Sequence, residues 1–300
     1  MLDARGVTSE TENRVLAYCS VFPSILIVAL LVAVPTAAGV AFSVQDVQIG
    51  EPTSPFVGLA HFQWALAADV FRSALANTLI WVFGSVGLEM VIGLGVALLL
   101  NRTFVGRGLA RAIVFAPYLI PTVVAVLVWR YMFHDVVGIM NHFLLGIGVI
   151  DAPLNWLATP KMAMVSVIIV GVWKFFPFVV LAILGVLQSV PQEQYEAARI
   201  DGASDWQQFW RITLPYVMPV FLLTALLRTI WTFHKFDIIY LLTGGGPMGA
   251  TTTLPVLVYQ KAFADFELGR AAALALITAF ILALMLGVYF YLTKRAEARQ

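Results

Sequence analysis

The feature that most constrains this chain is a series of apolar stretches that are long enough to cross a lipid bilayer. A transmembrane helix needs about 20 predominantly apolar residues. Six stretches of roughly this length contain at most one Asp, Glu, Lys or Arg each: 15–45, 73–101, 112–129, 162–192, 212–233 and 271–293. They lack the alternating pattern of membrane β-strands. We therefore predict an all-α membrane protein with transmembrane helices at about 15–43, 74–100, 112–133, 162–188, 216–236 and 270–293.

The composition supports a membrane protein and excludes several other classes. Hydrophobic residues make up 61% and charged residues 12% of the chain, whereas soluble domains are about 25% charged. The net charge of +1 offers no field for a polyanion, which excludes nucleic-acid binding. The single cysteine, Cys19, can build neither a disulfide framework nor a thiolate metal site, and no metal site is predicted.

Two further uncharged stretches are not predicted to span. Residues 136–150 are too short, contain three glycines, and are expected to form a re-entrant or interfacial segment. Residues 238–260 contain TGGGPMGATTTLP, which a lipid-exposed helix would not tolerate, so an ordered loop is expected there. The first apolar stretch is about twice the length of a signal-peptide core and is interpreted as an uncleaved anchor.

An even number of spans places both ends of the chain on one side of the membrane. The short segment 101–111 carries three arginines, and the tail 294–300 carries three more basic residues. Basic residues near spans are enriched on the cytoplasmic side. We therefore predict that segment 1–14, the loop 189–215 and the tail 294–300 are cytoplasmic.

The loop 189–215 reads as two short helices joined by a bend. Pro191 and Glu193 suit the first turn of one helix, and Gly202 is placed to end it in a left-handed conformation. Ser204 and Gln207 form a capping box for a second helix, which Pro215 is expected to close. An apolar face of that helix comprises Trp206, Phe209, Trp210 and Thr213. The pattern fits either a docking element or an amphipathic hairpin lying on lipid headgroups.

The amino-acid sequence of this loop resembles that of a known family. Glu196, Ala197, Ala198, Gly202, Ile212, Leu214 and Pro215 match the EAA---G---------I-LP signature of permease subunits in ABC importers. The segments FDIIYLLTGGGP (236–247), FVGLAHF (56–62) and APYLIPTVVAVLVW (116–129) are similar to maltose-type carbohydrate permeases. The resemblance implies the ABC importer permease fold and a location in a bacterial or archaeal cytoplasmic membrane.

The same resemblance implies a set of partners. A second permease subunit would complete a pathway for a disaccharide or oligosaccharide, two ATPase subunits would drive it, and an extracytoplasmic sugar-binding protein would deliver the sugar. ATP and Mg would be bound by the ATPase, so no cofactor is expected in this chain. The residues implied in ATPase coupling are Glu196, Ala197, Ala198, Asp201, Gly202, Trp206, Phe209, Ile212, Leu214 and Pro215.

No catalytic residues are predicted. The run Gly244–Thr251 has the glycine spacing of a phosphate-binding loop, but Ala250 stands where such a loop needs Lys. The chain is therefore expected to be a non-catalytic translocation subunit.

Charged residues at membrane depth are expensive and suggest function. Glu89, Lys174 and Arg228 lie within predicted spans, with Lys235 and Asp237 near a span end. These charges could pair with one another and hold helices in register, or they could line the sugar path. Arg228, Thr232 and Lys235 lie at i, i+4 and i+7 on the fifth span with Trp231 adjoining, and their positions resemble those lining the sugar site of the maltose permease. Gly171, Lys174 and Phe178 form a second such stripe on the fourth span, and the residues of both stripes are the predicted path residues.

Three alternatives remain open at this point. The cluster of Lys174, Arg228 and Lys235 would also suit a phosphorylated ligand of the glycerol-phosphate type. A membrane-embedded enzyme would need Glu89, Asp237 and His234 to converge. An ion-coupled secondary transporter usually shows repeated halves, and no clear internal repeat is visible here.

Overall fold

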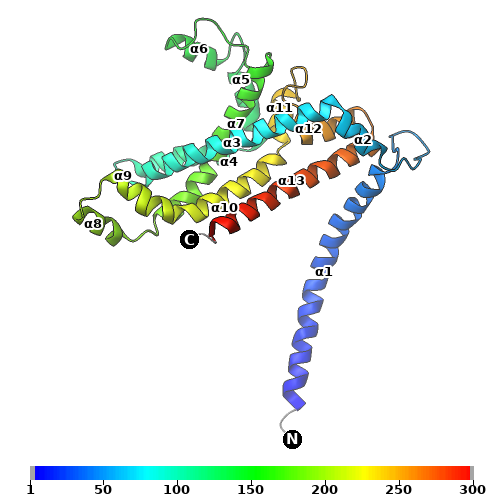
Figure 1. Ribbon diagram of the computed structural model, residues 1–300, viewed down its shortest axis with the longest axis horizontal. Coiled ribbons are helices and arrows are strands. Elements are labelled where there is room, and N and C mark those ends of the chain that lie inside the picture. The colour runs from blue at the N-terminus through cyan, green and yellow to red at the C-terminus, as the bar shows by residue number, and fades with distance from the viewer. Residues whose placement is uncertain (1–3, 298–300) are drawn as a thin grey trace. The chain divides into compact units, whose positions relative to one another are not determined.

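The computed structural model describes the backbone of residues 4–297 and the side chains of residues 14–291. Residues 1–3 and 298–300 of the two predicted cytoplasmic ends lie outside the described part. The described chain is built from helices (Figure 1), with β-structure limited to isolated bridges. In order, the α-helices are α1 Ala4–Ser43, α2 Ala60–Ala67, α3 Asp69–Asn101, α4 Arg107–Leu119, α5 Thr122–Met132, α6 Ile139–Gly146, α7 Pro160–Leu187, α8 Gln192–Ile200, α9 Asp205–Gln208, α10 Leu214–Phe233, α11 Asp237–Thr243, α12 Leu254–Tyr259 and α13 Leu268–Glu297.

The predicted fold class is confirmed. Five helical segments of the described chain are long and apolar enough to span a membrane, and α4 and α5 together also pass this test, which makes six if the bent pair is one span. The chain divides into two compact units, one of Met1–Ala65 with Lys261–Ile277 and one of Leu66–Gln260 with Thr278–Gln300.

The third predicted span is not the single helix expected over 112–133. It is broken between α4 and α5, which meet at 99°. Ile120 has an extended backbone, with φ −69° and ψ 133°, and Pro121 begins α5 as its N-cap. Proline has no N–H to donate and disfavours helical geometry in the residue before it, so the chain turns here.

The expected end of the hairpin helix at Pro215 is also wrong. Residues 205–233 form one helical run in which a π-turn, Phe209–Thr213, joins α9 to α10. The N–H of Leu214 donates to the carbonyl of Phe209, and Pro215 lies in the first turn of α10. A proline is tolerated there because its missing N–H coincides with the change of helical register.

An ordered loop was expected over 238–260, but parts of this segment are helical. Its two flanks form α11 and α12, and the glycine- and threonine-rich stretch between them does not form a helix. Residues 136–150 contain the short helix α6. Apolar side chains of this segment are exposed, among them Val136 before the helix and Phe143 within it. Buried Asn141 anchors this segment by donating to Asp135 O and Leu154 O, each at 3.0 Å.

The core of the larger unit is formed by α3, α7 and α10, which pack together. Two glycines permit close approach between α3 and α7. A Cβ on Gly171 would overlap the ring of Trp81, and a Cβ on Gly93 would overlap Val179. Small residues at such interfaces let membrane helices approach closely. Helices α8 and α9 precede α10 at one end, and α11 and α12 follow it at the other end (Figure 1).

In the smaller unit, residues 47–49 pair with residues 266–269 at the start of α13. The N–H of Ile49 donates to Phe266 O and the N–H of Gly269 donates to Val47 O, both at 3.1 Å. Trp64 lies beneath two cations, with Lys261 at 5.5 Å and Arg270 at 4.7 Å from its ring.

Candidate translocation and coupling sites

A buried ion pair joins α3 to α10. Arg228 Nε lies 2.6 Å from Glu89 Oε2, and Nη2 lies 2.9 Å from Oε1, with both side chains almost fully buried. Arg228 Nη2 also donates to Thr232 Oγ1 at 3.3 Å, and Trp81 Nε1 donates to Thr232 O at 3.0 Å. This two-pronged geometry satisfies the carboxylate and most of the guanidinium without water. The side chains of Arg228 and Thr232 are therefore used in contacts between helices of the core.

Lys174 caps the broken end of α4. Its Nζ, on buried α7, donates to Pro117 O at 3.2 Å and also to Ile120 O. Pro117 lies in the last turn of α4 and Ile120 is its C-cap, and at such an end a helix lacks internal donors and carries partial negative charge. The ammonium group therefore holds the bend in the third span.

Three cationic side chains lie close to the ring of Phe175. The charged groups of Arg228, Lys235 and Lys174 lie 4.5, 4.9 and 5.7 Å from its ring. Lys235 Nζ is 3.6 Å from Asp237 Oδ2, and both side chains are partly exposed. Each cation thus has an oxygen partner as well as the ring face: carboxylates for Arg228 and Lys235, and backbone carbonyls for Lys174.

Next to this cluster, three aromatic rings from three helices meet at the surface. Phe178 on α7 lies 6.1 Å from Tyr118 on α4 and 5.1 Å from Trp231 on α10, measured between ring centroids. Tyr118 is 41% exposed and Trp231 is 44% exposed. We call these three residues the aromatic face.

The structure separates the predicted path residues into two groups. Phe178, Trp231 and Lys235 reach the surface, whereas Gly171, Lys174, Arg228 and Thr232 are buried in helix contacts. Sequence reasoning missed Tyr118 and Phe175. Tyr118 carries no charge and becomes a neighbour of Phe178 only because the third span bends, which helix counting cannot show.

The residues needed for a membrane-embedded enzyme do not converge. Glu89 is held by Arg228, and Asp237 lies beside Lys235. No hydrogen bond or ion pair joins Glu89, Asp237 and His234 in the described part of the chain.

The hairpin between α7 and α10 has the predicted bend. Gly202 has φ +77°, the N–H of Ala203 donates to Ala198 O at 2.8 Å, and the N–H of Gly202 donates to Arg199 O at 3.0 Å. These two bonds form a Schellman motif, in which a left-handed glycine ends the helix. The predicted capping box follows directly, with Ser204 N–H to Gln207 Oε1 at 2.8 Å and Gln207 N–H to Ser204 Oγ at 3.3 Å. Both predictions are confirmed.

Side-chain contacts fix the hairpin to the base of α10. Tyr195 Oη and Thr213 Oγ1 lie 2.9 Å apart, and Gln208 Nε2 donates to Ala203 O at 2.9 Å. The hairpin is therefore tied to the helical run that enters the core.

The hairpin exposes both apolar and charged side chains. Rings of Trp206, Phe209 and Trp210 contact one another at 5.4 to 6.0 Å, with Trp206 68% exposed. Ile200 is 87% exposed beside the bend, a feature that the sequence pattern did not single out. Of the other predicted coupling residues, Glu196, Ala197, Asp201, Gly202 and Pro215 are exposed, and Ala198, Ile212 and Leu214 are half-buried.

Comparison with known proteins identifies the family. Residues 89–298 match the model of the family described as "Binding-protein-dependent transport system inner membrane component". The trehalose/maltose transport system permease protein MalF of Thermococcus litoralis is 38% identical over 288 residues, covering 95% of this chain and 96% of that protein. The trehalose transport system permease protein SugA of Mycobacterium tuberculosis is 34% identical over 279 residues, covering 91% of this chain and 88% of that protein.

A solved structure supports the fold independently. A chain of a bacterial ABC transporter involved in the import of the acidic polysaccharide alginate superposes with a TM-score of 0.83 at 22% identity, covering 96% of this chain and 98% of that one. The broken third span and the hairpin thus belong to a chain with the ABC importer permease fold. The protein is a multi-pass inner-membrane permease of the binding-protein-dependent transport family, a translocation component rather than an enzyme.

Proposed function

We propose that this chain is the translocation subunit of an ATP-driven sugar importer and that its hairpin, residues 189–215, receives force from a separate ATPase. The observation that carries this proposal is the rigid hairpin itself. The Schellman bend and capping box preorganise it, and it continues without interruption into α10. Exposed aromatic side chains together with the exposed carboxylate of Glu196 are the composition expected of a docking surface, where packing gives affinity and charge fixes register.

The partners in this proposal follow from the family. A second permease subunit completes the pathway, two ATPase subunits bind ATP and Mg, and an extracytoplasmic binding protein delivers the ligand. The hairpin then lies on the cytoplasmic side, as the basic residues of segment 101–111 predict.

The ligand that fits best is a neutral disaccharide or oligosaccharide. Aromatic rings stack on the apolar faces of pyranose sugars, and the aromatic face of Tyr118, Phe178 and Trp231 offers such rings beside Lys235 and Asp237. Two relatives with similar coverage are named for trehalose or maltose. A glycerol-phosphate-type ligand is less well supported, because every cation around Phe175 already has an oxygen partner.

A substitution at the bend tests coupling. In the complex reconstituted in liposomes, Gly202→Ala forces a side chain into a left-handed conformation at φ +77° and is expected to reduce ATP-dependent sugar uptake at least ten-fold while the complex still assembles. Gly146→Ala is the matched control, since that glycine lies in α6 with no atom within 4 Å of the added Cβ and should leave uptake unchanged.

Two results would overturn the proposal. One is sugar uptake by the wild-type chain alone in liposomes without nucleotide. The other is equal loss of uptake in the Gly202 and Gly146 variants, which would show that the bend has no special role.

A further inference from the structure

The loop between α3 and α4, residues 102–106, lies at a membrane surface, because it joins two helices of candidate membrane spans through a very short connection. The chain then crosses twice, through α4 with α5 and through α7, before it reaches the hairpin. Two crossings return the chain to the same side. The loop therefore shares the cytoplasmic side that the proposed function assigns to the hairpin, and the inference rests on that assignment.

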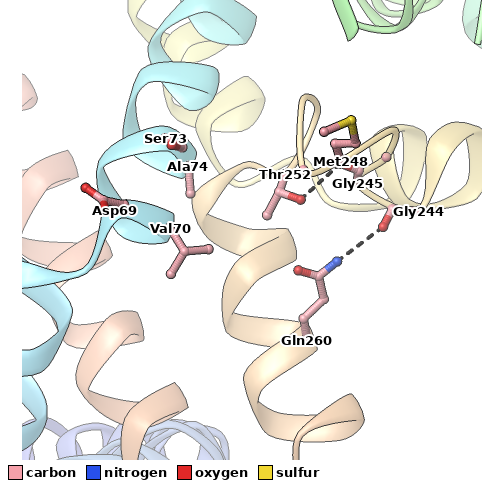
Figure 2. Close-up of a pocket in the computed structure, with 11 residues that line it drawn as sticks. Asp69, Val70, Ser73, Ala74, Gly244, Gly245, Met248, Thr252 and Gln260 are labelled. Atoms are coloured by element: carbon pink, nitrogen blue, oxygen red, sulfur yellow. Dashed lines mark hydrogen bonds between the residues drawn. The ribbon is translucent and has the colours of Figure 1, made fainter. Parts of the chain in front are cut away.

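The positive charges of this loop have no acidic counterpart nearby, since residues 90–134 contain no Asp or Glu. Arg102 is exposed and Arg107 is half-buried, and no ion pair joins either of them to a carboxylate in the described part of the chain. At the other end of α3, Arg72 Nη2 lies 2.8 Å from Asp69 Oδ1. Asp69 also lines a cavity of about 470 Å³ between α3 and the loop after α11 (Figure 2). Positive charge is thus neutralised within the protein at that end of α3 and left open at the end near α4.

The start of α4 adds a second feature that attracts an anion. Gly106 is the N-cap, with φ +85°, and no side chain caps the helix. The first N–H groups of a helix lack intrahelical acceptors, and this end carries partial positive charge. Arg111 Nη2 donates to Leu100 O at 3.3 Å, which ties the start of α4 to the last turn of α3. An uncapped helix start held in this way is a favourable place for phosphate oxygens.

Apolar side chains next to these arginines are exposed. Val105 at the tip of the loop is fully exposed, and Phe104 beside it is 46% exposed. Leu109 and Ile113 are 69% and 64% exposed and share one face of α4, because they lie four positions apart on a helix. This apolar face continues from the arginines into the membrane-spanning part of α4. A bilayer leaflet has the same order, with charged headgroups above acyl chains.

We propose that this loop and the first turn of α4 bind the headgroup of an anionic phospholipid in the cytoplasmic leaflet. The phosphate lies at the start of α4 beside Arg102 and Arg107, and the acyl chains lie against Leu109 and Ile113. An anionic lipid is favoured over a zwitterionic one, whose own amine already balances its phosphate. The surface of an ATPase fits less well, because the apolar face continues toward the membrane interior, which a cytoplasmic protein does not reach.

Fluorescence quenching in nanodiscs measures the lipid preference of this site. In the assembled complex, a fluorophore is attached to Val105→Cys in a Cys19→Ser background, and brominated phosphatidylglycerol is compared with brominated phosphatidylcholine as the quencher. Each arginine near an anionic surface contributes roughly a five-fold preference, so the loop should favour phosphatidylglycerol by about ten-fold or more. Arg102→Gln should lower this preference about five-fold. Arg130→Gln is the matched control and should leave it unchanged, because Arg130 is an exposed arginine in the last turn of α5, away from the loop.

The preference should also fall as ionic strength rises, a measurement that leaves every arginine in place. Equal quenching by the two lipids, or the same loss of preference in the Arg102 and Arg130 variants, would overturn the inference. Loss of quenching by both lipids when the ATPase binds would also overturn it, because the loop would then contact a protein. ATP-dependent sugar uptake by the same complex in liposomes separates the two proposals. If uptake is present in these cases, the proposed function stands and only the lipid site fails; if uptake is absent, the proposed function fails on its own.

Discussion

At the residue scale, the charges inside the helical bundle mainly stabilise it. Their presence was evident from the sequence, because charged side chains are rare in apolar stretches. The partners of these charges could not be predicted from the sequence. Glu89 and Arg228 lie 139 positions apart, and only the packing of α3 on α10 brings them together. The same holds for Lys174, whose acceptors are backbone carbonyls that exist as free acceptors only because the third span breaks.

Breaking the Glu89–Arg228 pair should destabilise the protein strongly. Arg228→Met leaves a buried carboxylate unpaired, which costs about 3–5 kcal/mol when one partner of such a pair is removed. The thermal midpoint of the purified complex should fall clearly. Adding Glu89→Leu should recover most of that loss, and a double variant no more stable than the single one would contradict this account.

Removing the cap on α4 should loosen the bend. With Lys174→Met, the carbonyls of Pro117 and Ile120 lose their donor, so the angle between α4 and α5 should become less defined. Spin labels at exposed Ile113 and Leu127 report this angle. The distance distribution is expected to broaden relative to the lysine-containing protein, and an identical distribution would exclude a role for Lys174 at the bend.

At the element scale, local signals predicted local structure. Ser204, Gln207 and Gly202 predicted a helix start and a helix end because capping depends on residues a few positions apart. The direction of a helix does not follow from such signals. The apolar pattern predicted one unbroken span over 112–133, because hydropathy measures only length and polarity, so the 99° turn before Pro121 was not predicted. Likewise, Pro215 suggested an end where a π-turn lets the helix continue.

The capping box should stabilise the hairpin locally. Ser204→Ala removes the oxygen that accepts from the Gln207 N–H and should cost about 1 kcal/mol. Hydrogen exchange of the amides at 205–208 should therefore speed up roughly five-fold. Ser189→Ala is a suitable control, because the Ser189 hydroxyl only donates to Val186 O at the end of α7. Equal protection in the two variants would argue against the cap.

At the scale of the whole molecule, the hairpin and the cavity beside the loop after α11 lie at opposite ends of the core helices of the larger unit. Between them, α10 connects the hairpin to the Arg228 and Trp231 positions and then to α11. A rigid helical connection of this kind is what a subunit needs in order to link events on the two faces of a membrane.

The central claim is that the hairpin meets an ATPase on the cytoplasmic side. Its most direct test is a cysteine at exposed Ile200, in a Cys19→Ser background, treated with a membrane-impermeant thiol reagent in vesicles of known orientation, with Met248→Cys as the opposite-face control. The account predicts labelling of position 200 only in inside-out vesicles, with protection when the ATPase is bound, and labelling of position 248 only in right-side-out vesicles. Labelling of position 200 from the external medium would contradict it.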